Sequence, residues 1–361
     1  MLVDIIAGSR PDILRVASVL EAIQHEQRKG TRIGYRFIYT GKDIDINLDK
    51  DLFTQLEISR PNIYLDVTDD TENAQTASAI TRYARVLKNN KPDVILLTGQ
   101  TATVVGCAIA ARRLHDIRIG IIHAGVRTGN MEYPAEINRI ISDSIADFYF
   151  TASHIANDNL RSIGIADENI FLSGNTYIDI IQKTKKQYAA PELWDTLSLQ
   201  QDNYAVLILN KPYNTGDSLH LKNLILTCLK QMKNTPIIMV VNTETEKALQ
   251  KLSIQAHNLH IVKRLGFRQL GFLLQHAKAV LTDSTSIQEQ CAVLMTPTLT
   301  LYPYCECQET IQAGTNRMAG DELFDIENSI AGLNKNRSKG NIPYLWDGKA
   351  AERIWEVLKR L

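Results

Sequence analysis

Short apolar runs alternate with longer segments of helical periodicity along most of the chain, and no other feature of the sequence constrains its fold as much. The runs have the length of buried strands, and amphipathic segments separate them. Such alternation predicts repeated βαβ units and a parallel sheet, and therefore an α/β fold. We expect strands at residues 3–7, 34–39, 94–97, 117–122, 148–151, 170–171, 204–209, 237–241, 260–262, 279–281 and 298–301. We expect helices at residues 12–27, 74–89, 101–114, 136–145 and 153–163, with others between the later strands.

The chain is long enough to require two domains, because 361 residues exceed what one hydrophobic core usually organises. Residues 173–176, Ser-Gly-Asn-Thr, fall between two series of strands, and we interpret them as a hinge. We therefore predict domains over residues 1–174 and 175–347. Residues 348–361 have one apolar face at helical spacing, which predicts a helix that packs against a domain.

Composition excludes several classes of partner. Forty basic residues balance forty acidic ones, so no long-range positive field would gather nucleic acid or an anionic membrane surface. The first apolar run is too short for a signal peptide or a membrane span, and we expect a cytoplasmic protein. The five cysteines are scattered, and the thiols of Cys305 and Cys307 alone cannot complete a zinc site, so we expect no metal site.

Turns that follow predicted strands contain residues suited to an anionic ligand or to proton transfer. In a parallel sheet, the carboxyl ends of the strands share one edge, where helix N-termini offer N–H donors. Arg10, in the segment 8–12, could hold a phosphate with its planar guanidinium, or it could be a solvated charge near a helix start. Segments 98–101 and 123–129 follow two consecutive strands. His123 could transfer protons near neutral pH, or it could be a hydrogen-bonded structural group.

A similar turn follows a strand in the second half of the chain, where the strand at 279–281 runs directly into a helical segment. Ser284, Thr285 and Ser286 would place hydroxyl and backbone N–H groups at the positive end of that helix, which suits a diphosphate. The alternative is an ordinary helix cap made by Asp283 or Ser284.

Taken in order, these segments resemble motifs of the non-hydrolysing UDP-N-acetylglucosamine 2-epimerases. Segment 8–12, Gly-Ser-Arg-Pro-Asp, resembles the family's Gly-Thr-Arg-Pro-Glu; segment 124–129 resembles its Ala-Gly-Leu-Arg-Thr-Gly, and segment 134–139 its Pro-Glu-Glu-x-Asn-Arg. Segments 174–176, 282–284 and 313–315 resemble its Gly-Asn-Thr, Thr-Asp-Ser and Ala-Gly-Thr. The resemblance implies two Rossmann-like domains of the GT-B type with a cleft between them, a UDP-binding second domain and a C-terminal helix that crosses back to the first. It also implies a homodimer that needs no nicotinamide cofactor.

The resemblance further implies a reaction in which UDP leaves as a proton is removed from the sugar, and UDP then adds back to the sugar. The family assigns proton transfer to carboxylates, whose positions here hold Gln100, His123 and Ala135. We expect His123 to act as the base, with Glu136 or Glu132 moved in beside it. Further departures place Lys211 near the family's histidine, Cys307 at an arginine and Gln290 at the ribose-binding glutamate.

The leading hypothesis is an isomerase that interconverts UDP-N-acetylglucosamine and UDP-N-acetylmannosamine or a related UDP-HexNAc. The alternative is a catalytically impaired relative that binds a nucleotide-sugar or a partner protein in a regulatory or assembly role, and glycosyl transfer is a third reading. Residues assigned to substrate binding are Arg10, Arg127, Arg139, Lys211, Asp283, Ser284, Thr285, Ser286 and Gln290, and those assigned to catalysis are His123, Glu136 and Gln100.

Overall fold

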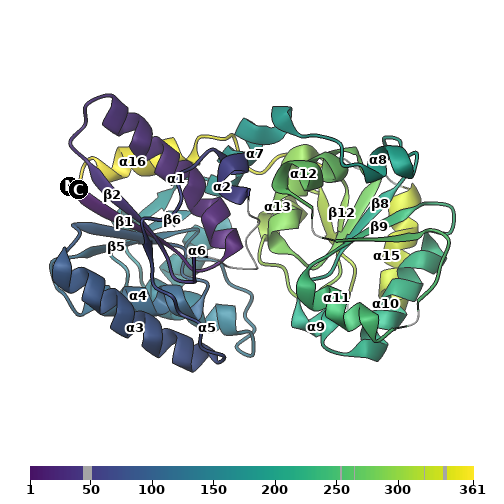
Figure 1. Cartoon of the computed structure of the whole chain (residues 1–361), viewed down its shortest axis with the longest axis horizontal. Helices are drawn as coiled ribbons and strands as arrows, with labels where there is room; N and C mark the ends of the chain where they lie inside the picture. The colour runs from purple at the N-terminus through teal and green to yellow at the C-terminus, as the bar shows by residue number, and fades with distance from the viewer. Residues whose placement is uncertain (44–50, 253, 264, 321, 336–339) are drawn as a thin grey trace. The chain divides into compact units, whose positions relative to one another are not determined.

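The computed structural model describes residues 1–43, 51–252, 254–263, 265–320, 322–335 and 340–361, which form two compact units (Figure 1). Unit 1 comprises Met1–Lys183 and Tyr344–Leu361, and unit 2 comprises Thr184–Pro343. Each unit is built on one parallel sheet with helices on both faces, so the predicted pair of Rossmann-like α/β domains is confirmed. The chain passes between the units after residue 183 and after residue 343, whereas the sequence suggested boundaries after residues 174 and 347.

The sheet of unit 1 has the strand order β3-β2-β1-β4-β5-β6-β7. Its strands are β1 Leu2–Ala7, β2 Gly34–Tyr39, β3 Ile63–Tyr64, β4 Val94–Leu97, β5 Arg118–Ile122, β6 Phe148–Thr151 and β7 Ile170–Leu172. All of the pairings are parallel, with Val3 opposite Tyr35 on one side and Val94 on the other. The order of the strands reverses between β1 and β4, and α/β sheets bind ligands at the carboxyl ends of strands beside such a reversal.

Helices of unit 1 cover both faces of this sheet (Figure 1). They are α1 Arg10–Arg28, α2 Leu52–Leu56, α3 Glu72–Asn89, α4 Ala102–Arg112, α5 Pro134–Ile145, α6 His154–Ser162, the 3-10 helix Asp167–Asn169, α7 Thr176–Thr184 and α16 Ala350–Leu358. α3 and α4 pack with the strands in one apolar core, and α1 and α16 lie on the opposite face, as Figure 1 shows.

The C-terminal segment returns to unit 1 and is fixed there by buried polar contacts. The indole nitrogen of Trp346, which is 1% exposed, donates to the Ala152 carbonyl at 3.1 Å. The Asp179 carboxylate accepts hydrogen bonds from the first amides of α16, at 3.0 Å from Ala350 and 2.8 Å from Ala351. The predicted terminal helix that crosses back is therefore confirmed. The segment 173–176 also lies inside unit 1, and the chain leaves the unit only at the end of α7.

The sheet of unit 2 has the order β10-β9-β8-β11-β12-β13, and its order reverses between β8 and β11. Its strands are β8 Ala205–Ile208, β9 Ile237–Val241, β10 Leu259–Lys263, β11 Ala279–Thr282, β12 Thr298–Thr300 and β13 Asn316–Met318. Its helices are the 3-10 helix Lys185–Gln187, α8 Leu193–Thr196, α9 Pro212–Thr215, α10 Ser218–Gln231, α11 Thr243–Gln250, α12 Phe267–His276, α13 Thr285–Leu294, α14 Gln308–Gln312 and α15 Leu323–Lys335. One apolar core joins the sheet to α10, α11 and α15, and a second joins it to α12 and α13.

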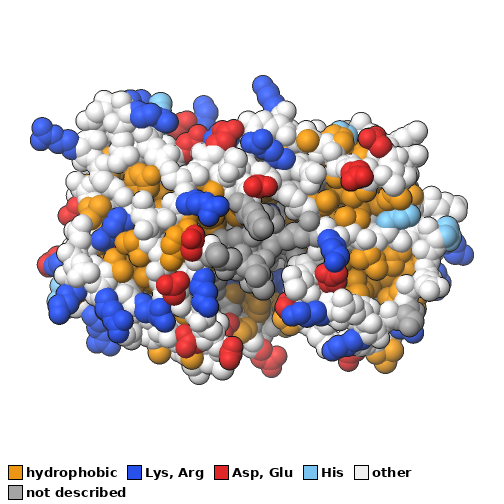
Figure 2. All heavy atoms as spheres, viewed as in Figure 1, with side chains coloured by type: hydrophobic (Ala, Val, Ile, Leu, Met, Phe, Trp, Pro, Cys, Tyr) orange, Lys and Arg blue, Asp and Glu red, His pale blue; other side chains and the backbone are white. Residues whose placement is uncertain are grey.

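The surface matches the balanced composition. Acidic and basic side chains both occur on the face of each unit that Figure 2 shows. Within the described ranges, no helix is both long enough and apolar enough to cross a membrane.

Candidate functional site

In unit 1, Asp12 joins the turn after β1 to the turn after β4. Its buried carboxylate accepts hydrogen bonds from the Gly8 amide at 3.1 Å, the Ser9 hydroxyl at 2.9 Å and the Thr98 hydroxyl at 2.5 Å. A Cβ on Gly8 would lie 2.3 Å from the Thr101 hydroxyl, so the glycine allows the two turns to approach each other. The segment that contains Arg10 is thereby fixed at the strand-order reversal.

Gln100 and His123 follow the adjacent strands β4 and β5 and so lie at the same edge of the sheet. The side-chain amide of Asn138 in α5 donates to the Gln100 carbonyl at 3.2 Å and fixes that turn. His123 is 7% exposed and has a left-handed backbone with a φ of 65°. A non-glycine residue in this region costs about 1–3 kcal/mol and persists only where its surroundings hold it, often at functional sites.

Glu136 holds the loop that follows β5. Its carboxylate is 1% exposed and accepts hydrogen bonds from the Thr128 amide and hydroxyl, from the Gly129 amide at 3.0 Å and from Arg139 Nη1 at 3.1 Å. These donors surround both carboxylate oxygens. A proton-transfer role for Glu136 would require some of them to be released.

Arg127 is held by Asp143, a residue that the sequence did not single out. Arg127 Nη1 lies 2.7 Å from Asp143 Oδ2, and the same carboxylate accepts from the Gly125 amide at 3.2 Å. Burial raises the pKa of Asp143, and the neighbouring Arg127 opposes that rise. Among the described residues, Arg127 Nη2 is a buried donor with no hydrogen-bond acceptor. A buried unsatisfied donor is costly, so this nitrogen is suited to an anionic ligand.

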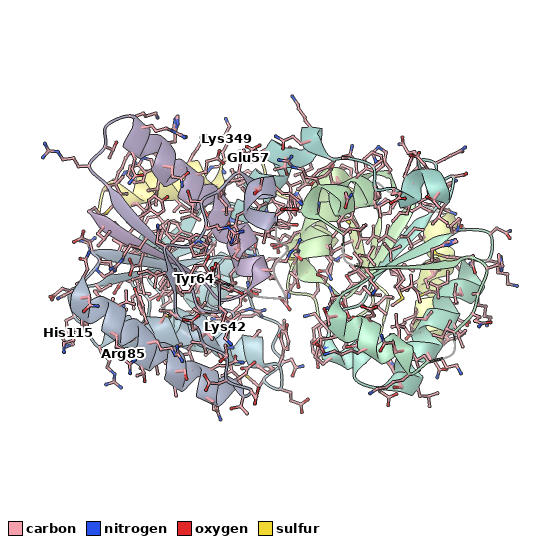
Figure 3. The ribbon with its side chains drawn as sticks, in the orientation of Figure 1. Lys42, Glu57, Tyr64, Arg85, His115 and Lys349 are labelled. Atoms are coloured by element: carbon pink, nitrogen blue, oxygen red, sulfur yellow. The ribbon has the colours of Figure 1, made fainter. Side chains whose placement is uncertain are left out.

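One further cation belongs to this edge of unit 1. Lys42 follows β2 and lies apart from Arg85 and His115, as the labelled side chains in Figure 3 show. His115 precedes β5 and therefore belongs to the amino ends of the strands. Of these three residues, only Lys42 follows the carboxyl end of a strand.

In unit 2, Asp283 fixes the turn between β8 and α9. The carboxylate is fully buried and accepts from the Asn210 amide at 2.8 Å, the Lys211 amide at 3.0 Å and Asn214 Nδ2 at 2.9 Å. Burial raises the pKa of Asp283, and the bond from Asn214 opposes that rise. Asp283 was assigned to substrate binding, and this geometry shows it holding the backbone that presents Lys211.

The Lys211 ammonium lies 2.8 Å from Glu306 Oε1 and 4.6 Å from the centre of the Tyr302 ring. The sequence singled out the segment of Glu306 only for its two cysteines. Burial raises the pKa of Cys305 to about 12, and Cys307 is fully buried. In the part of the chain that the structure describes, no group of three His, Cys, Asp or Glu residues could hold a metal ion.

The N-terminus of α13 follows β11 directly, as predicted, at the strand-order reversal of unit 2. Neither proposed capping side chain caps it within the described residues, because Asp283 is bonded to the β8–α9 turn and Ser284 makes no capping bond. The Ser284 and Ser286 hydroxyls lie 3.2 Å apart at the start of the helix. Further along α13, the buried amide of Gln290 donates to the Tyr188 hydroxyl at 3.0 Å.

The structure thus gathers the predicted residues at the carboxyl edge of each sheet. In unit 1 these are Arg10, Gln100, His123, Arg127, Glu136 and Arg139, and in unit 2 they are Lys211, Asp283, Ser284, Thr285 and Ser286, with Gln290 further along α13.

Comparison with known proteins shows the family of the chain. A UDP-N-acetylglucosamine 2-epimerase of Methanocaldococcus jannaschii is 29% identical over 370 residues, covering 99% of each chain. A UDP-2,3-diacetamido-2,3-dideoxy-D-glucuronate 2-epimerase of Pseudomonas aeruginosa is 27% identical over 358 residues, covering 99% of each chain. The crystal structure of the M. jannaschii enzyme in complex with UDP-GlcNAc and UDP is 28% identical and superposes over all of both chains with a TM-score of 0.89. Residues 25–359 match the family profile described as UDP-N-acetylglucosamine 2-epimerase. The chain therefore belongs to the UDP-N-acetylglucosamine 2-epimerase family.

Proposed function

We propose that this protein binds a UDP-HexNAc and interconverts UDP-N-acetylglucosamine and UDP-N-acetylmannosamine, or a closely related pair. The observation that supports this most strongly is the N-terminus of α13, which lies at the strand-order reversal of unit 2 without a side-chain cap from Asp283 or Ser284. Its first N–H groups and the positive end of the helix dipole suit a diphosphate. The M. jannaschii relative, whose structure holds UDP-GlcNAc and UDP, has the same fold throughout.

Unit 2 is proposed to hold the nucleotide. The hydroxyls and amides of Ser284, Thr285 and Ser286 would bind the diphosphate, and the Lys211 ammonium would add a positive charge. Lys211 is paired with Glu306, so phosphate binding would replace or share that contact. Gln290 would hydrogen-bond a ribose hydroxyl. Asp283 would act on the ligand through the Lys211 backbone that it fixes.

Unit 1 is proposed to act on the sugar. His123 would accept the proton from carbon 2 as the bond between carbon 1 and UDP breaks, leaving a double bond between the two carbons. A proton from solvent then adds to the opposite face of carbon 2, and UDP returns to carbon 1 on its original face. This gives the epimer, so the sum of the two steps needs no nicotinamide. The Arg127 Nη2 donor and Arg10 would stabilise negative charge, as preorganised donors do in elimination reactions. Gln100, Glu136 and Arg139 would orient the groups around His123.

Separation of the reaction mixture tests this proposal. The protein is incubated with UDP-N-acetylglucosamine, and UDP-sugars and UDP are resolved by anion-exchange chromatography. The proposal expects the manno epimer to accumulate, with free UDP as an intermediate released in small amount. If neither the epimer nor UDP forms across a panel of UDP-HexNAc substrates, the assigned activity is refuted.

Binding without turnover is the second candidate, and the environment of Glu136 favours it. That carboxylate is surrounded by donors, and Gln100 and Ala135 offer no acid at the neighbouring turns. Loss of one catalytic acid commonly costs a factor of about 10² to 10⁴ in rate. Saturable UDP binding by calorimetry together with an inert reaction mixture would select this candidate over the isomerase.

We also propose that the protein acts as a cytoplasmic homodimer. The resemblance to the family supports the dimer. The cysteines support a cytoplasmic location, because all five are free thiols, as is usual where the surroundings are reducing. Light scattering at several concentrations tests the dimer, and a monomeric mass at all of them would refute it.

A further inference from the structure

Three tyrosines form a ring cluster at the carboxyl edge of the unit 2 sheet. The rings of Tyr213 and Tyr302 have centroids 5.4 Å apart at an interplanar angle of 79°, and those of Tyr302 and Tyr304 are 5.7 Å apart at 65°. Tyr302 is 6% exposed, whereas Tyr213 and Tyr304 are 47% and 37% exposed. The cluster therefore consists of two accessible rings on one buried ring.

The cluster adjoins the proposed phosphate site. Tyr302 and Tyr304 follow β12, and Tyr213 lies in α9 after β8, so ring contact between them spans the end of β11, the strand that lies between β8 and β12. The Lys211 ammonium lies 4.6 Å from the centre of the Tyr302 ring, and the Lys211 amide is bonded to Asp283. A group attached to a phosphate at Lys211 would therefore lie within reach of these rings.

We propose that Tyr213, Tyr302 and Tyr304 form the subsite for the glycosyl ring of the UDP-sugar. This inference rests on the proposed function. In a UDP-sugar the order of groups is base, ribose, diphosphate and sugar. Gln290 is placed at the ribose on one side of Ser284, and the tyrosines lie beside Lys211, so the group next to the tyrosines is the sugar. The accessible tyrosine rings would pack on the apolar C–H face of a pyranose and exclude water from it.

This packing also bears on which sugars the site prefers. Tyr213 and Tyr304 present mostly carbon, with one hydroxyl each, so the cluster has few groups to pair with sugar hydroxyls. A deoxy sugar, which brings fewer hydroxyls to these rings, should be favoured over a fully hydroxylated hexose.

Calorimetry with two ligands tests the subsite. The full chain is titrated with UDP and with UDP-N-acetylglucosamine, using wild type, Y213A and Y304A. Loss of one ring contact is expected to weaken UDP-N-acetylglucosamine binding by about 3-fold to 10-fold, while UDP binding stays the same. Phe324→Ala is the matched control, because Phe324 is an aromatic of the same unit with 72% exposure. It should change neither affinity.

Several outcomes would overturn the inference. An equal loss of affinity for UDP and for the UDP-sugar would assign the rings to the nucleotide, and unchanged affinities in both variants would remove them from the site. Tyr213→Leu and Tyr304→Leu keep apolar bulk and replace any alanine variant that fails to fold. Wild type that fails to bind UDP would refute the proposed function itself, which separates that failure from failure of the subsite.

Discussion

Replacing Asp283 with asparagine distinguishes a residue that supports the site from one that binds the ligand. The substitution preserves shape and exchanges one carboxylate oxygen for an NH₂ group. In the wild type, one oxygen accepts from the Asn210 amide at 2.8 Å, and the other accepts from the Lys211 amide at 3.0 Å and from Asn214 at 2.9 Å. In D283N, the one remaining oxygen can keep the bonds from Lys211 and Asn214, and the Asn210 amide then faces the new NH₂ donor.

The magnitude follows from these contacts. A hydrogen bond to a charged group contributes about 1.5–3 kcal/mol, and one is lost outright. Burial raises the pKa of Asp283, so the neutral amide recovers part of the cost of burying a charge. We expect D283N to lower the free energy of unfolding of unit 2 by about 2 kcal/mol.

Urea denaturation followed by circular dichroism measures this loss, and calorimetry on the same samples measures UDP affinity. Ser286→Ala is the comparison, because it should weaken UDP binding without a comparable loss of stability. If D283N were as stable as wild type yet failed to bind UDP, the carboxylate would act on the ligand directly. The support role argued for Asp283 would then be wrong.

The remaining predictions concern unit 1. His123→Asn should lower epimerase kcat by a factor of about 10² to 10⁴. Its stability should change little, because asparagine tolerates the left-handed backbone at this position. A steady-state assay measures kcat and thermal melting measures stability, and an undiminished kcat would exclude His123 as the base. Burial raises the pKa of Asp179 to about 6, so between about pH 4 and pH 6 the carboxyl keeps its proton in the folded protein and loses it in the unfolded chain. Wild type should therefore lose stability relative to D179N as the pH rises from about 4 to 6. Urea midpoints of wild type and D179N at about pH 4 and pH 6 test this, and an equal change in midpoint for the two proteins would contradict it. Gly174→Ala should destabilise unit 1 by about 3 kcal/mol or more, because φ is 88° and the new Cβ would lie 2.3 Å from the Leu345 carbonyl oxygen. Gly164→Ala has the same φ of 88° with no atom within 4 Å, so it should cost only about 1 kcal/mol, and equal losses in the two variants would refute the steric argument.

Much of the fold could be predicted because parallel strands buried on both faces read as continuous apolar runs. β2, β4, β6 and β9 begin and end at the predicted residues. β3 and β13 were not predicted, because β3 has only two residues and β13, Asn316–Met318, is mostly polar, so neither forms such a run.

The turns of the site could be predicted from topology alone, since residues after neighbouring parallel strands share an edge. Their partners could not. The sequence shows no sign that Asp143 would hold Arg127 or that Glu306 would pair with Lys211, because these contacts depend on side-chain directions in the folded units. The carboxylate of Glu136 was assigned to catalysis for its position, and the donors around it became evident only in the structure.

The hinge prediction shows the same limit. A glycine between two series of strands suggested a joint at Gly174. In the structure, the positive φ of Gly174 instead allows the returning Leu345 segment to pack closely within unit 1.

Proton NMR of UDP-N-acetylglucosamine in deuterium oxide decides whether the protein is an epimerase, because removal of the hydrogen at carbon 2 is the step that distinguishes an epimerase from a binding protein. We expect catalytic amounts of the protein to replace this hydrogen with deuterium and to produce the manno epimer. Retention of the hydrogen, with the ligand demonstrably bound, would contradict it.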